Sequence, residues 1–424
     1  MEKRRESYDV VIIGGGAAGL TAAIYCGRAR LNTIVLEKSL PGGLATYTSE
    51  IENYPGFPET LSGPDLMKLF EKQAKKFGVK IKLTQVDQVE LDRDPKIVVT
   101  PRVDYEAKAV VVASGGKPRL TGAKNEEKFL FGRGLSFCAT CDAARYAGKT
   151  ILVVGSGDAA IEEALFLSKF AKKIYLSVVH DVGIMDANQV AQERARQCPQ
   201  FEFLWNTVVD EYVGDEEVET VILRNLKTGE RIPLPVDGCF LFIGYLPNSE
   251  LFRGVLDMTP QGYILTDDAM RTNVEGVFAA GDVREKYLRQ VATSVGDGAI
   301  AGVAAERYIA ESECIRQEIL GNSLPTLVYF WNAADTDSRD FLRVVEELEA
   351  EYRGRLHVRK VDVYKSTGIA RKLGVTRAPA VAFVRSGRVS QIKEGSEAMD
   401  ADSLRRQVSA FVAPTDGLAA AGAE

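Results

Sequence analysis

Apolar and polar positions in the first half of the chain form short strand-like runs separated by helical stretches. Residues 8–13 and 33–37 are apolar runs of strand type, and residues 17–28 between them read as a helix. The same order returns at residues 149–154, about 159–169, and 173–179. Repeated strand–helix–strand units predict an α/β fold.

The first of these helices follows the glycine-rich loop Gly14-Gly15-Gly16-Ala17-Ala18-Gly19. Gly14 permits a tight turn, Gly16 lets the backbone approach a pyrophosphate, and Gly19 lets the helix pack closely on the strand. The positive end of the helix then faces the phosphates. Glu37 ends the next strand, at the spacing of an acid that holds a ribose hydroxyl. This order of elements predicts a dinucleotide site.

A second loop, residues 155–160, opens the helix of the second strand–helix–strand unit. The strand that follows ends in Val178-Val179-His180-Asp181. An NADH site would place Asp or Glu at this strand end, and an NADPH site would place arginines there. Asp181 lies beyond the usual position of the acid, so binding of NADPH or NADH stays open at this point.

A third segment, residues 272–282, is an apolar run that we expect to be a strand ending in Gly281-Asp282. After it come Arg289-Gln290-Val291-Ala292 and an alanine-rich helix that extends to about residue 309. An aspartate at a strand end can hold a ribityl hydroxyl, and the amides at the helix start can face a flavin carbonyl. A packed strand and helix without a ligand is the simpler alternative.

Between the loops lies Cys138-Ala139-Thr140-Cys141-Asp142, a pair of cysteines followed by an acid. Such a pair can close a readily reduced disulfide, and Asp142 could supply the proton that a leaving thiolate needs. Taken alone, the pair could equally be half of a zinc site or two ordinary thiols. The sequence has no second Cys-x-x-Cys, and the flanking nucleotide loops favour a redox role.

The last hundred residues follow another pattern. Apolar runs at residues 324–331, 357–363 and 381–384 predict strands, and residues 340–352 predict an amphipathic helix. Ala378-Pro379 stands just before the last of these strands, in a peptide bond that can become cis at low cost.

Composition narrows the setting without deciding the chemistry. The chain has 424 residues, of which 46% are hydrophobic and 26% charged, with a net charge of −6. This balance provides no basic field for nucleic acid, and no apolar run is long enough for a bilayer. The start of the chain lacks the features of a signal peptide, and six cysteines do not suggest a disulfide framework. We therefore expect a cytoplasmic protein of two or three domains.

Residues 8 to 310 resemble the low-molecular-weight thioredoxin reductases. The matching segments, in chain order, are Gly42-Gly43, Glu52-Asn53-Tyr54-Pro55-Gly56, Ser62-Gly63-Pro64, Cys138-Ala139-Thr140-Cys141-Asp142, Gly244-Tyr245-Leu246-Pro247-Asn248 and Gly281-Asp282-Val283. The resemblance implies two Rossmann-like domains in a homodimer. The FAD-binding domain would comprise residues 1–116 and 248–312, and the inserted NAD(P)-like domain, residues 117–247, would carry the cysteine pair.

The resemblance also implies roles for individual residues. Cys141 would face the flavin, Cys138 would attack the disulfide of a thioredoxin-like protein, and Asp142 would donate a proton. The expected FAD contacts are Gly14, Gly16, Ala17, Ala18, Gly19, Glu37, Lys38, Gly43, Leu44, Asn53, Ala113, Gly115, Gly281, Asp282, Arg289, Gln290, Val291 and Ala292.

The chain departs from that family at two places. The family's His-Arg-Arg-x-x-x-Arg signature for NADPH has Val179, His180 and Ile184 at its three arginine positions, and Leu44 replaces a glutamine beside the flavin. Each lost charge-assisted contact is worth roughly 1.5–3 kcal/mol. Similar reductases without the signature take electrons from ferredoxin or a reduced deazaflavin, and some relatives run in reverse as oxygen-dependent dithiol oxidases. The electron donor therefore stays open.

The end of the chain resembles thioredoxin. We expect a linker at residues 313–323, a thioredoxin-like domain at 324–415 and a flexible tail at 416–424. Both thioredoxin cysteines are replaced, by Asp335 and Ser338, and Tyr329 stands where that family keeps a buried aspartate. Such a domain cannot exchange disulfides, so we expect a docking or regulatory module, with a relic that adds only stability as the alternative.

These features together predict an FAD-dependent disulfide oxidoreductase of the thioredoxin reductase type. Two alternatives remain: a dithiol oxidase, and a flavin-binding sensor or docking protein that catalyses no turnover.

Overall fold

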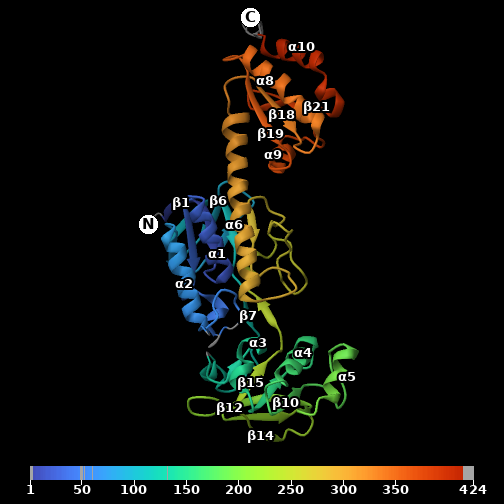
Figure 1. Ribbon diagram of the computed structural model, residues 1–424. Coiled ribbons are helices and arrows are strands. Elements are labelled where there is room, and N and C mark those ends of the chain that lie inside the picture. Colours follow the sequence, from blue (N-terminus) through green and yellow to red (C-terminus); the bar gives the residue numbers. More distant parts are fainter. Residues whose placement is uncertain (1–2, 48–50, 52, 60, 131, 414–424) are drawn as a thin grey trace, which may run out of the picture. The chain divides into compact units, whose positions relative to one another are not determined.

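A computed structural model describes residues 3–47, 51, 53–59, 61–130 and 132–413 (Figure 1). The chain divides into two compact units, residues 1–306 and 307–424. Within the described ranges, no helix combines the length and the apolar character that crossing a membrane requires.

The first unit contains a seven-stranded sheet in the order β3-β2-β1-β6-β5-β4, with β17 paired to the far end of β6. Strands β1, β2, β3, β6 and β17 are parallel, and β4 and β5 are antiparallel additions. The bounds are β1 Arg4–Ile13, β2 Thr33–Glu37, β3 Lys80–Leu83, β4 Gln88–Glu90, β5 Lys96–Val99, β6 Val103–Val112 and β17 Val277–Ala279. The helices of this part are α1 Ala17–Arg28, α2 Gly63–Lys76 and α6 Val291–Glu313, with 3₁₀ turns η1 Gly43–Tyr47 and η4 Glu250–Phe252. The boundary between the two units, after residue 306, falls inside α6.

Helices α1 and α6 can approach closely because α6 carries glycines where the two helices meet. A Cβ on Gly298 would lie 2.2 Å from the Ala18 carbonyl oxygen, and one on Gly302 would lie 2.7 Å from the Tyr25 Cβ. The close approach fixes the start of α6 beside the first glycine loop.

A second sheet of five parallel strands, in the order β11-β10-β9-β15-β8, lies within the same unit. Its strands are β8 Leu135–Ser136, β9 Thr150–Val154, β10 Lys173–Val178, β11 Phe201–Trp205 and β15 Gly238–Leu241. An antiparallel sheet, β12 Thr207–Val213, β13 Thr220–Asn225 and β14 Arg231–Pro235, accompanies it. The helical elements are η2 Glu126–Phe129, α3 Ala139–Asp142, η3 Ala143–Tyr146, α4 Asp158–Leu167 and α5 Gln189–Gln197.

The chain enters and leaves this second part through a two-stranded ribbon, β7 Gly116–Pro118 and β16 Tyr245–Pro247. The insertion of one βαβ part into another confirms the predicted α/β class.

The unit at residues 307–424 is built on the four-stranded sheet β19-β18-β20-β21, and Ala378-Pro379 is cis as expected. The bounds are β18 Thr326–Trp331, β19 His357–Asp362, β20 Ala380–Arg385 and β21 Arg388–Glu394. Its helical elements are the π-type η5 Cys314–Leu320, α7 Thr336–Asp340, α8 Leu342–Glu351, α9 Thr367–Lys372, η6 Gly395–Met399 and α10 Ala401–Val412. This is the thioredoxin-like domain expected from the sequence.

Two expected elements differ in the structure. The run at residues 272–282 is a strand only over β17, because Gly276 turns the chain at φ +75° and the Thr272 hydroxyl donates back to the Val277 carbonyl at 2.9 Å. The segment expected as a linker is helical to Leu320, and the side chains of Cys314, Ile315 and Ile319 belong to the core of the second unit.

Candidate active site

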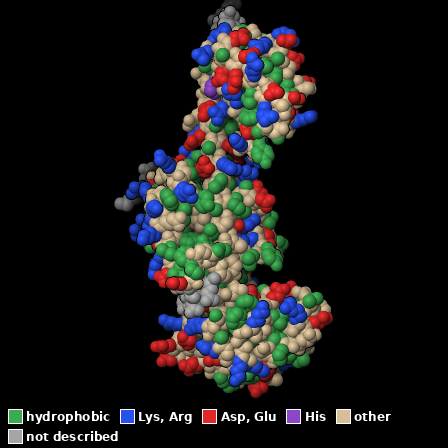
Figure 2. Space-filling model, in the orientation of Figure 1, with side chains coloured by type: hydrophobic (Ala, Val, Ile, Leu, Met, Phe, Trp, Pro, Cys, Tyr) green, Lys and Arg blue, Asp and Glu red, His purple; other side chains and the backbone are tan. Residues whose placement is uncertain are grey.

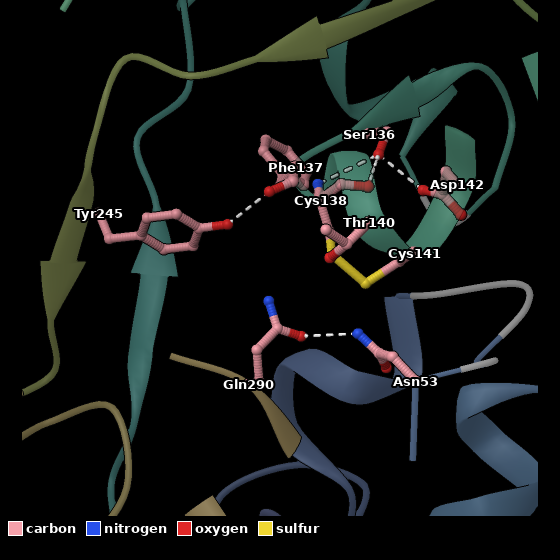
Figure 3. The surroundings of a disulfide bond; sticks show 9 residues. All are labelled: Asn53, Ser136, Phe137, Cys138, Thr140, Cys141, Asp142, Tyr245 and Gln290. Atoms are coloured by element: carbon pink, nitrogen blue, oxygen red, sulfur yellow. Dashed lines mark hydrogen bonds between the residues drawn. A yellow bond between two sulfur atoms is a disulfide. The ribbon is translucent and has the colours of Figure 1, made fainter. Parts of the chain in front are cut away.

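Cys138 and Cys141 are joined in a disulfide at the end of the short strand β8 (Figure 3). Their Cα atoms are 5.3 Å apart, and Cys141 lies in the single turn α3 that follows Cys138. The Thr140 hydroxyl lies 3.4 Å from the Cys138 sulfur. The sequence therefore predicted the bonded pair correctly. In the parts of the chain that the structure describes, no group of three or more His, Cys, Asp or Glu residues is arranged to hold a metal.

The buried residue Ser136 connects the acid to the nucleophile segment. Its hydroxyl donates to an Asp142 carboxylate oxygen at 2.6 Å and accepts from the Cys138 amide at 3.2 Å. Asp142 is thereby held beside the disulfide from the far end of α3. Sequence analysis missed Ser136, although a serine two residues before Cys138 is placed to form such a side-chain-to-backbone bond.

The hydroxyl of Tyr245, at the start of β16, donates to the Phe137 carbonyl oxygen at 2.7 Å. Phe137 directly precedes Cys138, so this bond joins the connecting ribbon to the redox segment (Figure 3). Burial raises the pKa of the Tyr245 hydroxyl, and the nearby carboxyls of Asp282 and Glu163 raise it further.

Two amide side chains also lie in the surroundings of the disulfide (Figure 3). The Asn53 side-chain amide donates to the Gln290 side-chain oxygen at 3.2 Å. Asn53 comes from the loop before α2, and Gln290 directly precedes α6. The structure thus brings together two residues, 237 positions apart, that the sequence assigned to one cofactor.

The first glycine loop has the geometry of a nucleotide cradle. Gly14 adopts φ +108°, and a Cβ there would lie 2.3 Å from the Ala113 carbonyl oxygen. A Cβ on Gly19 would lie 2.0 Å from the Gly14 carbonyl oxygen. The Gly15 amide donates to the buried Glu37 carboxylate at 2.7 Å.

A pocket of about 630 Å³ opens at the end of this loop. Its lining includes the predicted residues Gly14, Glu37 and Lys38. Other predicted contacts surround the loop: Gly43 and Leu44 begin η1, Gly43 approaches Gly16, Ala17 and Ala18 open α1, and Ala113 and Gly115 follow β6.

The third segment lies against the same loop. Gly281, at φ +80°, is so close to α1 that a Cβ would lie 2.8 Å from the Ala18 Cβ. The Ser294 hydroxyl donates to Asp282 at 3.2 Å, and burial raises the pKa of the Asp282 carboxyl. Val291 and Ala292, expected just before the alanine-rich helix, are its first two residues in α6.

Sequence analysis did not find the carboxylate beneath this segment. Asp297 is buried and accepts from the Gly281 amide at 3.0 Å and from Lys286 at 2.8 Å. The Arg289 guanidinium lies 4.1 Å from the centre of the Tyr263 ring. No local pattern marks the contacts of Asp297, because they join the segment after β17 to the interior of α6.

The second glycine loop keeps its shape, since Gly155 adopts φ +130° and a Cβ there would lie 2.6 Å from the Phe242 carbonyl oxygen. Its polar groups pair with one another. Asp186 accepts from His180 at 2.7 Å and from the buried Ser156 at 3.3 Å. Val179 and Ile184, at two of the altered signature positions, are 48% and 55% exposed.

Four further cysteines lie outside the pair. Cys26, Cys239 and Cys314 are buried, and Cys198 is half-buried at the end of α5. Burial raises the pKa of the Cys26 thiol to about 12 and also raises the pKa of Cys239 and Cys314.

In the second unit, hydrogen bonds involve Asp335 and Ser338, the two residues that the resemblance to thioredoxin aligns with its cysteines. The Tyr329 hydroxyl donates to the Ser338 carbonyl oxygen at 2.8 Å, and the Ser338 hydroxyl accepts from the Asn332 amide at 3.1 Å. Ser338 is fully buried, and Asp335 caps α7. Burial raises the pKa of Tyr329.

Comparisons with known proteins agree with both parts of the chain. The family model of pyridine nucleotide-disulphide oxidoreductases matches residues 8–298, and the thioredoxin model matches residues 309–410. A thioredoxin reductase of Peptoclostridium acidaminophilum is 44% identical over 308 residues, covering 71% of this chain and 97% of the relative. A bifunctional thioredoxin reductase/thioredoxin of Mycobacterium leprae is 35% identical over 424 residues, covering 90% and 92%. A solved thioredoxin reductase of Streptococcus pyogenes is 40% identical, covers 72% of this chain and 98% of its own, and has a TM-score of 0.67.

Proposed function

This chain belongs to the pyridine nucleotide-disulphide oxidoreductase family, and on that premise we propose that it reduces the disulfide of a thioredoxin-like protein. The observation that carries the proposal is the Cys138–Cys141 disulfide with Asp142 held beside it through Ser136. The family likeness makes the chain a flavoprotein oxidoreductase of the thioredoxin reductase kind.

The described residues suit an FAD. Gly14 and Gly19 allow β1, the loop and α1 to pack so closely that any Cβ would strike backbone, and Glu37 lines the pocket at the strand end. We propose that the first loop holds the pyrophosphate, Glu37 the ribose, and Asp282 the ribityl chain. A bound flavin would supply two electrons to the disulfide.

The cysteine pair then acts in two exchange steps. Two electrons and two protons convert the disulfide into two thiols. The Cys138 thiolate attacks one sulfur of the substrate disulfide, forming a mixed disulfide and releasing the first substrate thiolate. The Cys141 thiolate attacks the Cys138 sulfur, restores the internal disulfide and releases the second substrate thiolate.

We propose Asp142 as the proton donor to the departing thiolate. The Ser136 hydroxyl fixes one carboxyl oxygen at 2.6 Å. The carboxyl group is thereby fixed one residue after Cys141, a position that suits general acid catalysis at the pair.

The electron donor is the least conventional part of the proposal. No described residue at positions 179, 180 or 184 supplies a guanidinium, and His180 is paired with Asp186. We therefore propose that NADPH binds weakly and that a protein or flavin donor, such as a ferredoxin or a reduced deazaflavin, serves the enzyme.

The domain at the end of the chain is proposed to dock rather than react. Ser338 and Asp335 cannot form a disulfide, and Tyr329 binds the Ser338 carbonyl where the family has thiol chemistry. A tethered domain of this shape would compete with an external thioredoxin-like protein at a high effective concentration. We also propose a homodimer working in the cytoplasm, with its mass in solution as the test.

Anaerobic stopped-flow absorbance of the FAD-loaded protein tests the proposal. Flavin bleaching is followed with NADPH, NADH, reduced ferredoxin and a dithiol in turn. We expect bleaching by ferredoxin, slow bleaching by NADPH, and turnover with a thioredoxin disulfide. Peroxide release from a dithiol in air without reductive turnover would instead identify an oxidase. A bound flavin with no turnover in either direction would leave only a sensor role.

A further inference from the structure

The ribbon that joins the two parts of the first unit is fixed at one end. The Ser114 hydroxyl donates to the Asn248 carbonyl oxygen at 2.7 Å, and the Asn248 side chain donates back to the Ser114 carbonyl oxygen at 2.9 Å. The Asn248 amide also donates to the Gly115 carbonyl oxygen at 2.9 Å. These bonds attach the ribbon to the strand β6 and hence to the FAD-type sheet.

Glycines at both ends of the ribbon have conformations that other residues rarely adopt. Gly115 and Gly244 have φ values of +65° and +104°, and a Cβ on either would meet no atom within 4 Å. The surroundings therefore leave the backbone room to turn at both points.

One hydrogen bond connects this ribbon to the backbone that carries the nucleophile. Tyr245 lies opposite Pro118 in the ribbon, and its hydroxyl reaches the Phe137 carbonyl oxygen, 108 residues away, at 2.7 Å. Cys138 follows, and both its amide and its carbonyl bond to Ser136. This side-chain hydrogen bond thus links the ribbon to the backbone that leads into the disulfide.

Only one of the two partners in this hydrogen bond can be the donor. A carbonyl oxygen can only accept, so Tyr245 must donate. The packing around it and the neighbouring carboxyls of Asp282 and Glu163 keep the hydroxyl protonated, because they raise its pKa. The Tyr245 hydroxyl can therefore donate this bond whether the cysteines are oxidised or reduced.

We propose that Tyr245 is a positioning residue, a latch that holds the Cys138–Cys141 pair at the flavin and releases it toward the protein substrate. The latch rests on the proposed function, because the pair must serve both the flavin and an external disulfide. Opening the latch costs one neutral hydrogen bond, which leaves the ribbon and its anchoring at Ser114 intact.

Tyr245→Phe in the full-length, FAD-loaded protein tests the latch. Both proteins are reduced anaerobically by dithionite, and alkylation by a bulky maleimide is followed at Cys138 by mass spectrometry. Without the bond, the ratio of released to held pair should rise about two- to tenfold, the factor for a net hydrogen bond of about 0.5–1.5 kcal/mol. Alkylation of Cys138 should rise by the same factor.

Two controls separate the latch from general loosening. Cys198, half-buried in the same domain, is alkylated in the same tube and should react at an unchanged rate. Tyr175→Phe removes a hydroxyl from β10, where the ring faces Lys173 at 5.4 Å, and should leave Cys138 unaffected. An unchanged or slower reaction of Cys138 in Tyr245→Phe, or an equal rise at Cys198, overturns the latch.

Failure of the latch can be told apart from failure of the proposed function. Reoxidation of the dithionite-reduced flavin by the internal disulfide is recorded in the wild-type protein without any external substrate. If the reduced flavin does not pass electrons to the cysteine pair, the proposed reductase function is contradicted. The alkylation ratio still tests the role of Tyr245 as a latch.

Discussion

At the scale of single residues, the Ser136 hydroxyl holds the proposed proton donor and the proposed nucleophile together. It donates to one oxygen of Asp142 and accepts from the Cys138 amide, so the two residues share one anchor. The sequence predicted both cysteines and the acid. It could not predict the anchor, because a buried serine looks like any small core residue until its partners are known.

Asp142→Asn tests the acid. The variant should keep FAD and form the disulfide, but the turnover number with a thioredoxin disulfide should fall about 10²- to 10⁴-fold, the range for loss of a general acid. Steady-state kinetics over a range of pH measure this. Ser136→Ala is the companion, and a far smaller loss is expected because the carboxyl itself remains. Equal activity of Asp142→Asn and the wild type would exclude the role in proton transfer.

At the scale of elements, both glycine loops keep their strand–turn–helix geometry, although the polar residues beside them differ. In the first loop, the Gly15 amide donates to the buried Glu37 carboxylate at the end of β2. Beside the second loop, His180 and Asp186, which follow β10, are hydrogen-bonded to each other. The sequence predicted both loops because glycine spacing is local. It could not predict Asp297 beneath Gly281 or the Tyr245 contact with Phe137, because those partners lie 16 and 108 residues apart.

Gly14→Ala tests the first loop. The added Cβ would lie 2.3 Å from a backbone oxygen at a φ of +108°, so the turn must distort and FAD should be lost during purification. The flavin-to-protein absorbance ratio measures this. Gly157→Ala in the second loop is the matched control, since its Cβ would meet no atom within 4 Å, and this variant should retain FAD.

The proposal of weak NADPH binding can be tested by introducing the three arginines of the family signature. In the triple variant Val179→Arg, His180→Arg and Ile184→Arg, NADPH should bind at least about tenfold more tightly, since each charge-assisted contact is worth roughly 1.5–3 kcal/mol. Titration followed by flavin bleaching measures the affinity. Val190→Arg adds one nearby arginine at a residue that is 65% exposed, and should bring no gain. No improvement in the triple variant would mean that the weakness lies elsewhere in the loop.

At the scale of the whole molecule, the chain combines a disulfide-bearing unit with a thioredoxin-family domain, in which the resemblance aligns Asp335 and Ser338 with the family's cysteines. Charges of both signs are interspersed on the face shown in Figure 2. The sequence predicted both folds. It placed the start of the thioredoxin-like domain too late in the chain. The apolar residues Ile315 and Ile319 lie in a helical stretch, and the sequence does not show that they pack in the core of that domain.

Removal of residues 307–424 tests the docking proposal, and the cut respects the cores because Ile315 and Ile319 leave with their own unit. If the tethered domain competes with external thioredoxin, the shortened enzyme should show a lower KM for that substrate at a similar turnover number. Flavin content and thermal unfolding of the remaining unit serve as controls. Unchanged kinetics would leave the domain only a structural role.

The burial of three of the four remaining cysteines has a practical consequence for measuring the redox state of the cysteine pair in cell lysates. Burial keeps reagents away from the Cys26, Cys239 and Cys314 thiols and raises their pKa, so these cysteines should react very slowly with maleimides. Isotope-coded labelling of lysates should therefore report Cys138 and Cys141, with Cys198 as a constant internal standard. The labelled fraction of Cys138 and Cys141, relative to Cys198, would then measure how far the cysteine pair is reduced by its electron donor.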